Sequence, residues 1–347
     1  MKNIDGLIQL SASDLVGHLN CSHLSALDLE VARGSLAKPD YYDPLLEVLR
    51  ERGFRHEQDF IAHLQESGHE IAVLEGVDIT DQAVEATLEA MRAGSEVIVQ
   101  AALRHGRWSG RADILRRVAL PSELGDWSYE IIDTKLARET KGGSVLQLCL
   151  YADLLSHMQG VPPENIYIVS PWTDFEPQKF RFPEYAAYFR RVKQSAEAAA
   201  DEGYEDATYP DPKPHCDICR WQNDCDKRRR DDDHLCLVAN ISKSQINELH
   251  AQGVETRHDL AALPTPLTFT PTKGSPLALE KARDQAAIQV RALEAGELQY
   301  ELLDVLPETG LAALPEPSPG DIFFDIESDQ FVGEHGIEYL FGYAYAD

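Results

Sequence analysis

Along the first two hundred residues, segments with the spacing of apolar residues that is typical of helices alternate with short apolar runs that are typical of strands. A spacing of three to four residues predicts helices over 13–33, 44–67, 81–94, 145–160 and 183–203. Short apolar runs bounded by turn residues predict strands over 70–74, 96–103, 108–118, 128–137 and 165–171. Three strands in a row, set among helices, predict an α/β fold in which helices flank a mixed sheet.

The pattern changes after residue 203. A segment rich in Pro and Asp leads to three closely spaced cysteines, and two short helices are predicted around Gly253. Another helix is predicted over 277–296, and two strands follow the Pro-rich stretch 307–320. We therefore expect three parts: a domain with the cysteine cluster over 1–235, a helical extension over 236–300, and a linker with the start of another domain over 301–347.

Charge narrows the range of functions. The 347 residues include 32 Lys and Arg against 59 Asp and Glu, a net charge of −27. Such an acidic chain is unsuited to coating nucleic acid, so nucleic-acid contacts must be local, in a basic groove or through a bound cation. No apolar run reaches the roughly 20 residues of a membrane helix, and the N-terminus lacks a secretory signal. We expect a cytoplasmic protein without a membrane partner.

Acidic and basic side chains mark two neighbouring predicted strands. Asp113 lies in GRADIL, and Asp133 and Lys135 lie in EIIDTKL. Residues two apart in a strand share a face, so Asp133 and Lys135 project together, and Asp113 would complete a carboxylate pair for a hard cation such as Mg²⁺. The lysine would orient or activate a water, or stabilise developing phosphate charge. Taken alone, a D-x-K tripeptide is more often an ordinary surface ion pair.

Two predicted helices add polar groups to this set. Gln147 and Tyr151 are four residues apart and share one face of the helix that follows the strands. His56 and Glu57 lie side by side on an earlier helix, from which one of them would supply a third metal ligand.

In this order, GxxH, GRAD, D-x-K and QxxxY resemble the motifs of RecB-family nucleases of the PD-(D/E)XK superfamily, over about residues 10–230. The resemblance implies a restriction-endonuclease-like mixed sheet, with His56, Asp113 and Asp133 as ligands of Mg²⁺ or Mn²⁺. It also implies that Lys135 is the catalytic lysine. Gln147 and Tyr151 would form the motif that faces the DNA and the active site.

Three of the six cysteines lie in CDICRWQNDC. Cys216, Cys219 and Cys225 are spaced as metal ligands, and a tetrahedral site needs a fourth, for which the candidates are Cys21, Cys236, His215 and His234. Resemblance to one RecB-like subgroup implies that Cys21 joins the three to hold a [4Fe–4S] cluster, a staple between the two ends of the nuclease domain. The alternative is structural Zn²⁺, because spacing alone does not distinguish the two.

The last segment carries a second acidic pair. Asp325 and Glu327 share a face of the predicted strand FFDIESD, which resembles the opening strand of an RNase H-like exonuclease. Its context resembles large bacterial proteins that join a RecB-like nuclease, an RNase H-like domain and a helicase, which implies a helicase domain or subunit as partner. We expect a truncated chain with an incomplete second site. Residues from about 320 to 347 should pack poorly, because an isolated hairpin is marginal.

These features together predict a metal-dependent nuclease that hydrolyses phosphodiester bonds of DNA. The resemblance implies an exonuclease that acts on single-stranded or end-containing DNA. The alternative is a non-catalytic DNA-binding module that carries an iron–sulfur or zinc site and serves a helicase partner.

Overall fold

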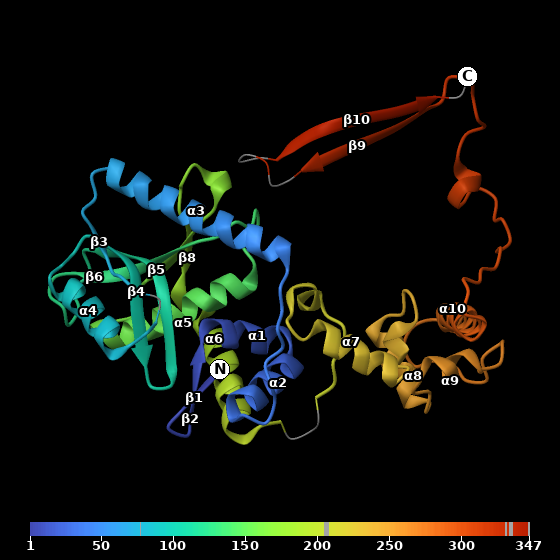
Figure 1. Cartoon of the computed structure of the whole chain (residues 1–347), viewed down its shortest axis with the longest axis horizontal. Coiled ribbons are helices and arrows are strands. Elements are labelled where there is room, and N and C mark those ends of the chain that lie inside the picture. The colour runs from blue at the N-terminus through green and yellow to red at the C-terminus, as the bar shows by residue number, and fades with distance from the viewer. Residues whose placement is uncertain (77, 205–207, 330–331, 333–335, 346–347) are drawn as a thin grey trace. The chain divides into compact units, whose positions relative to one another are not determined.

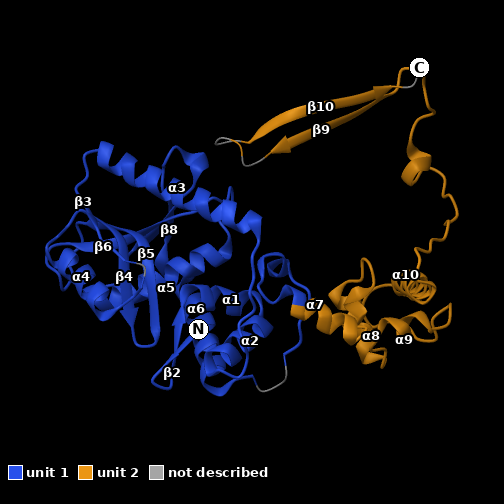
Figure 2. Ribbon diagram, in the orientation of Figure 1, with its two compact units in different colours: residues 1–223 blue, residues 224–347 orange. Residues whose placement is uncertain are grey.

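The computed structural model describes residues 1–76, 78–204, 208–329, 332 and 336–345. The chain divides into two compact units, 1–223 and 224–347, which Figure 2 colours separately. Each unit has a hydrophobic core of its own. The first unit contains the acidic residues and the lysine of the predicted active site.

A mixed sheet forms the centre of the first unit (Figure 1). Its eight described strands are β1 (Lys2–Ile4), β2 (Leu7–Ser11), β3 (Ile71–Val73), β4 (Val97–His105), β5 (Trp108–Val118), β6 (Ser128–Thr134), β7 (Asn165–Val169) and β8 (Gln178–Arg181). The main path runs β1-β2-β5-β6-β7-β8, and β4 pairs with β5 and with β3. The β5–β6 pair is antiparallel, whereas the β6–β7 pair is parallel.

Helices cover both faces of this sheet. They are α1 (Ala12–Asn20), α2 (Ser22–Arg33), α3 (Pro44–Glu66), α4 (Asp81–Arg92), α5 (Gly142–Gln159) and α6 (Phe182–Glu202). On one face, Phe60 and Leu64 of α3 pack with Ile132 of β6. On the other, Leu150 of α5 and Phe189 of α6 share a core with Ile131. Successive residues of β6 thus point to opposite layers, and Figure 1 shows α3 on the side of the sheet away from α5 and α6.

The second unit has a helical part and a hairpin. The helices are α8 (Lys243–Ala251), α9 (Arg257–Ala261) and α10 (Pro276–Ala295), and α7 (Gln222–Asp231) spans the division between the units. Leu249, Leu260 and Leu279 form part of the helical core. Short 3-10 helices occur in both units: Pro171–Thr173 and Pro214–Ile218 belong to the first, and Leu235–Leu237 and Gly310–Ala313 belong to the second.

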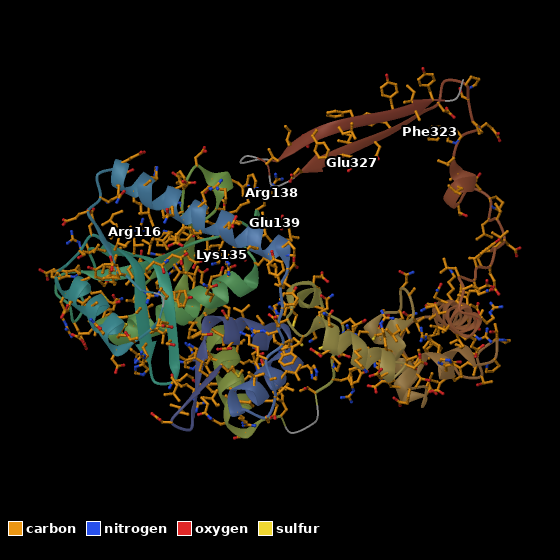
Figure 3. All side chains as sticks on the ribbon, viewed as in Figure 1. Arg116, Lys135, Arg138, Glu139, Phe323 and Glu327 are labelled. Atoms are coloured by element: carbon orange, nitrogen blue, oxygen red, sulfur yellow. The ribbon has the colours of Figure 1, made fainter. Side chains whose placement is uncertain are left out.

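The hairpin consists of β9 (Ile322–Asp329) and β10 (Ile337–Tyr345), which pair antiparallel. Its large apolar side chains stand in solvent: Phe323 is 69% exposed and Tyr343 is also 69% exposed. Figure 3 labels Phe323 and Glu327 on β9. For the described residues of this segment, the expectation that it packs poorly is confirmed by these exposed fractions; residues 330–331, 333–335 and 346–347 lie outside the described part of the chain. Its acidic pair, Asp325 and Glu327, is exposed as well.

Four details differ from the sequence-based expectation. The helix predicted over 13–33 is two helices, because the extended backbone of Cys21 separates α1 from α2 and its thiol accepts a hydrogen bond from Leu24 N. The first helix begins at Ala12, one residue before the predicted start, and its N-cap is Ser11, which forms a reciprocal capping box with Asp14. The strand predicted to run through residue 137 ends at Thr134. The short strands β1, β2 and β8 were not predicted.

No helix within the described residues is long and apolar enough to cross a membrane.

Candidate active site

The two predicted carboxylates lie together at the end of the β5–β6 pair. Asp133 is the penultimate residue of β6 and is fully buried, with 0% exposure. Asp113 reaches across from β5, where its Oδ2 accepts hydrogen bonds from Thr134 N at 3.0 Å and from Thr134 Oγ1 at 3.3 Å. The backbone next to Asp133 therefore fixes the position of the Asp113 carboxylate.

Lys135 completes the group, and its side chain forms an ion pair with Asp133 Oδ2. Although β6 ends at Thr134, the backbone N of Lys135 donates to Val169 O at 2.9 Å, which continues the pairing with β7 by one residue. This bond keeps Lys135 in line with the strand. Asp133 and Lys135 thus share a face, as the two-residue period predicts.

Burial and like charge work against ionised Asp133. Burial, followed by the neighbouring Asp113 carboxylate, raises the pKa of Asp133 to about 7, although Lys135 opposes the shift. For Lys135 itself, burial lowers the pKa, but Asp133 and Asp113 outweigh it and the net shift is upward. The lysine is therefore an ammonium at neutral pH, which suits it to stabilising negative charge rather than to accepting a proton.

The polar pair on α5 faces the carboxylates. Gln147 Nε2 donates to Asp133 Oδ1 at 3.4 Å and to the Tyr151 hydroxyl at 3.2 Å. Tyr151 is only 6% exposed, and burial raises the pKa of its hydroxyl, which therefore stays protonated. The structure brings Asp113, Asp133 and Lys135 together with the QxxxY pair.

The upstream pair on α3 divides between two environments. His56 is buried; its Nε2 lies 3.1 Å from Val169 O and its ring stacks on Phe175. Glu57 instead lies within electrostatic reach of Asp113 and Lys135: burial, then Asp113, raises its pKa. The predicted ligand His56 is thus held at the end of β7, whereas Glu57, its neighbour in sequence, lies with the acidic group.

Gln100 is a site residue that no sequence pattern indicates. It lies in the middle of β4 with a φ of 59°, a left-handed conformation that few residues other than glycine adopt. Its carbonyl accepts from Arg111, and its side-chain amide donates to Glu57. Such a backbone conformation leaves no mark in the sequence, and strained positions of this kind cluster at functional sites.

The acidic pair matches the chemistry of a hard divalent cation. Two neighbouring carboxylates, one of them fully buried, repel one another, and a bound cation would relieve that repulsion. Asp133 and Asp113 therefore fit such an ion. A complete ligand set is not preformed: within the described part of the chain, no group of three or more His, Cys, Asp or Glu side chains is arranged to hold a metal ion.

Three of the four cysteines predicted to bind a cluster lie within electrostatic reach of one another in the first unit, although the described cysteines are not arranged as a metal site. Burial raises the pKa of the Cys219 thiol, and the neighbouring Cys216 and Cys21 add to the increase. Cys21 stands at the N-cap of α2, and Cys216 lies in the 3-10 helix Pro214–Ile218. Cys225 lies six residues beyond Cys219, on α7.

The sequence matches the family model of the PD-(D/E)XK nuclease superfamily over residues 21–226. This match spans more than half of the chain, which therefore belongs to the PD-(D/E)XK nuclease superfamily. Members are typically nucleases, and most use Mg²⁺ or Mn²⁺. The mixed sheet with flanking helices is consistent with this fold.

One solved structure that matches is described as "Crystal structure of SSO0001". It shares 15% sequence identity at a TM-score of 0.35, and the alignment covers 64% of this chain and 88% of that chain. Among curated proteins, no match to the sequence was found.

Proposed function

We propose that this protein is a Mg²⁺- or Mn²⁺-dependent nuclease that hydrolyses phosphodiester bonds of DNA. The observation that carries the proposal is the fully buried Asp133 with the half-buried Asp113 and the Lys135 ammonium beside it. Removing two acids and a cation from water costs folding free energy, and such groups are typically retained at sites that bind a ligand of complementary charge. A phosphodiester with its metal ion is such a ligand.

Each side chain has a separate task in this mechanism. Asp113 and Asp133 would hold the cation, with His56 as the third ligand that the family resemblance implies. The bound cation would neutralise phosphate charge and lower the pKa of an attacking water. Lys135 keeps its proton, stabilises the negative charge that develops on the phosphate and orients the water. Gln147 and the protonated Tyr151 hydroxyl fix the orientation of Asp133.

The finer features of the substrate come from the RecB-like resemblance. We propose an exonuclease that acts on single-stranded or end-containing DNA and works with a helicase domain or subunit. In this proposal the nuclease domain extends over 1–235, a helical region over 236–300, and a linker with the start of an RNase H-like domain over 301–347. Asp325 and Glu327 would belong to that last domain.

We also propose that Cys21, Cys216, Cys219 and Cys225 bind a [4Fe–4S] cluster. The proximity of Cys21 to Cys216 and Cys219, which are almost 200 residues away in sequence, supports this proposal. Thiolates are the ligands of both iron–sulfur clusters and structural zinc, so Zn²⁺ is the competing occupant.

The second candidate function is a non-catalytic DNA-binding module. The observation in its favour is that no three metal-ligating side chains converge within the described residues. The test is incubation of the full chain with end-labelled single-stranded DNA and Mn²⁺, with and without EDTA. A nuclease cuts only in Mn²⁺, and Lys135→Ala loses that activity by a factor of about 10² or more.

Lys193→Ala is the matched control for this test. Lys193 is also a half-buried lysine in an ion pair, 2.7 Å from Asp153, but it lies on α6 outside the acidic group. Its variant should cut DNA as the wild type does. Binding of DNA without metal-dependent cutting in the wild type would reject the nuclease in favour of the module.

A further inference from the structure

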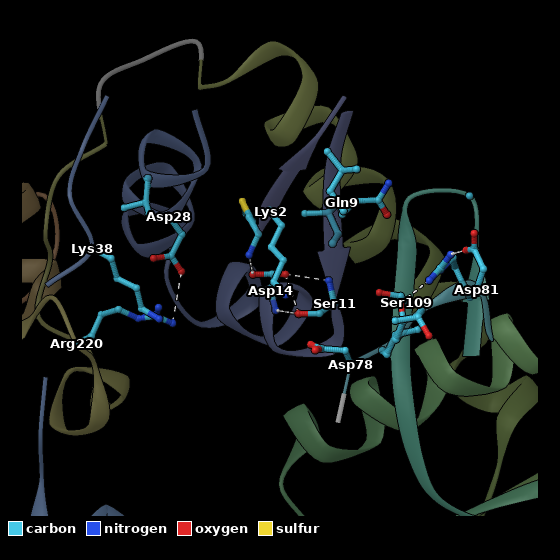
Figure 4. Close-up of a pocket in the computed structure, with 18 residues that line it drawn as sticks. Lys2, Gln9, Ser11, Asp14, Asp28, Lys38, Asp78, Asp81, Ser109 and Arg220 are labelled. Carbon is cyan, nitrogen blue, oxygen red and sulfur yellow. Dashed lines mark hydrogen bonds and ion pairs between the residues drawn. The ribbon is translucent and has the colours of Figure 1, made fainter. Parts of the chain in front are cut away.

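Three cavities of the first unit share one residue, Arg220. The cavity nearest the active site has a volume of about 580 Å³ and is lined by Gln147, Lys141 and Arg220 among others. A second, of about 870 Å³, shares Asp28 and Arg220 with the first (Figure 4). A third, of about 530 Å³, is lined by Lys38, Tyr41 and Arg220 among others. We call this series of cavities the Arg220 groove; it starts at Gln147, which contacts Asp133.

The groove is a built feature of the fold. One wall is the first turn of α5 against α1, where a Cβ on Gly143 would lie 3.0 Å from Val16 Cγ1. Another wall includes Arg220 and the 3-10 helix Pro214–Ile218 before it. The indole Nε1 of Trp221 donates to Asp28 Oδ1 at 2.9 Å and so fixes the Arg220 segment to α2.

Charge along the groove differs from that of the chain. Its cationic side chains match its acidic ones in number, although the whole chain has a net charge of −27. The acidic groups are Asp14, Asp28, Asp40, Asp78 and Asp81, and the basic ones are Lys2, Lys38, Arg104, Lys141 and Arg220. Part of the acidic charge is already compensated: Asp81 pairs with Arg104, and Asp14 caps α1.

Several of the groove's cations are available to a ligand. Within the part of the chain that the structure describes, Lys38 and Lys141 form no ion pair. The Arg220 guanidinium is 3.8 Å from the Asp28 carboxylate, a loose pairing that leaves the arginine side chain 38% exposed (Figure 4). Exposed ammonium and guanidinium groups along one groove are the usual contacts of a nucleic-acid backbone, and Tyr41 offers a ring on which a base can stack.

We propose that the Arg220 groove binds one strand of nucleic acid, with Arg220 and Lys141 on its phosphates, and leads that strand to Gln147 and Asp133. This inference rests on the proposed nuclease function. A series of joined cavities accommodates a single backbone, whereas a duplex requires a broad open surface. The groove also answers the objection from net charge, since the contacts with phosphate are confined to it.

Binding without cleavage tests the groove separately from the chemistry. The full chain, purified anaerobically, is titrated in EDTA against fluorescent oligo-dT, and anisotropy is recorded at several salt concentrations. Lys141→Ala and Arg220→Ala should each weaken binding about 3- to 10-fold near 0.1 M salt and reduce the salt slope by about 0.7. Arg220→Lys should restore most of the affinity. Lys179→Ala is the control, because this exposed lysine of β8 lies outside the three cavities.

The outcomes separate the two proposals. The groove is rejected if both alanine variants bind oligo-dT as tightly as the wild type, or if a hairpin duplex of equal length binds more tightly than the single strand. If the wild type binds the strand through Arg220 and Lys141 but does not cut it in Mn²⁺, the groove stands and the nuclease proposal fails. Arg220 directly follows Cys219, so a substitution there also changes the cysteine segment. Lys141→Ala lies outside that segment and therefore tests strand binding independently of the cysteines.

Discussion

The ring of Tyr151 occupies the space that a side chain at Gly110 would need. A Cβ on Gly110 would lie 2.3 Å from Tyr151 Cε1, far inside any normal contact distance. Gly110 begins the GRAD motif on β5, and Tyr151 ends the QxxxY motif on α5. The two motifs are therefore linked by direct packing: glycine leaves the space that the Tyr151 ring occupies, and from there the tyrosine hydroxyl accepts the hydrogen bond from Gln147.

Gly110→Ala should therefore damage both stability and activity. The added methyl group has to displace a buried ring, which we expect to cost about 1–3 kcal/mol of unfolding free energy. Displacement of Tyr151 also removes the partner of Gln147, so cleavage should fall even at temperatures where the variant stays folded. Urea denaturation and cleavage assays measure the two effects.

Gly53→Ala is the contrasting variant for this prediction. Its new Cβ would meet only Leu136 Cδ1, at an ordinary 3.9 Å, and the residue lies inside α3. Alanine is the better helix former, so the variant should be as stable as the wild type or more so by about 0.5–1 kcal/mol. Equal stability of Gly110→Ala and wild type would contradict the packing relationship.

Sequence reasoning reached the acidic site because the site depends on local rules. The two-residue period puts Asp133 and Lys135 on one face, and the helical period does the same for Gln147 and Tyr151. The left-handed backbone of Gln100, the break at Cys21 and the contact between Gly110 and Tyr151 depend instead on residues distant in sequence. No pattern within a single segment records them, and for that reason they emerged only from the structure.

Replacement of Asp133 by Asn should stabilise the metal-free protein at pH 8. The folded-state pKa of Asp133 is raised to about 7 by burial and by Asp113, above the unfolded value near 3.8, so its ionised form destabilises the fold. This destabilisation is present above pH 7 and is relieved as the pH falls through 7. Asp133→Asn removes it, and we expect a gain of about 1–3 kcal/mol at pH 8.

Chemical denaturation in EDTA between pH 5.5 and 8.5 measures this effect. The wild type should lose stability as the pH rises through 7, and Asp133→Asn should show less of that loss. Added Mn²⁺ should stabilise the wild type above pH 7 and leave Asp133→Asn unchanged, because metal ligation needs the ionised carboxylate. A wild-type stability that rises between pH 6 and 8 in EDTA, with no difference in Asp133→Asn, would reject the assignment.

His56 and Glu57 can be distinguished as metal ligands. If His56 ligates the cation, His56→Ala should lower Mn²⁺ affinity at least about tenfold, measured by thermal shift against metal concentration. Glu57→Gln keeps the hydrogen-bonding shape toward Gln100 and removes only a charge near Asp113, so its effect should be smaller. The opposite order of effects would transfer the ligand role to Glu57.

Metal analysis of the wild type and of Cys21→Ser should identify the metal that the cysteines bind. If the four cysteines hold a [4Fe–4S] cluster, anaerobically purified protein should be brown and contain about four iron atoms per chain. Cys21→Ser should lose most of that iron and lower the thermal stability, because the cluster joins α2 to a segment almost 200 residues later. Cys149→Ser is the control: Cys149 is buried within α5, away from the other thiols, so iron content should persist in that variant. A colourless wild-type protein with one zinc per chain would contradict the cluster and indicate a structural zinc site instead. In that case, the thermal stability of Cys21→Ser would still show whether Cys21 is a ligand that joins the two segments.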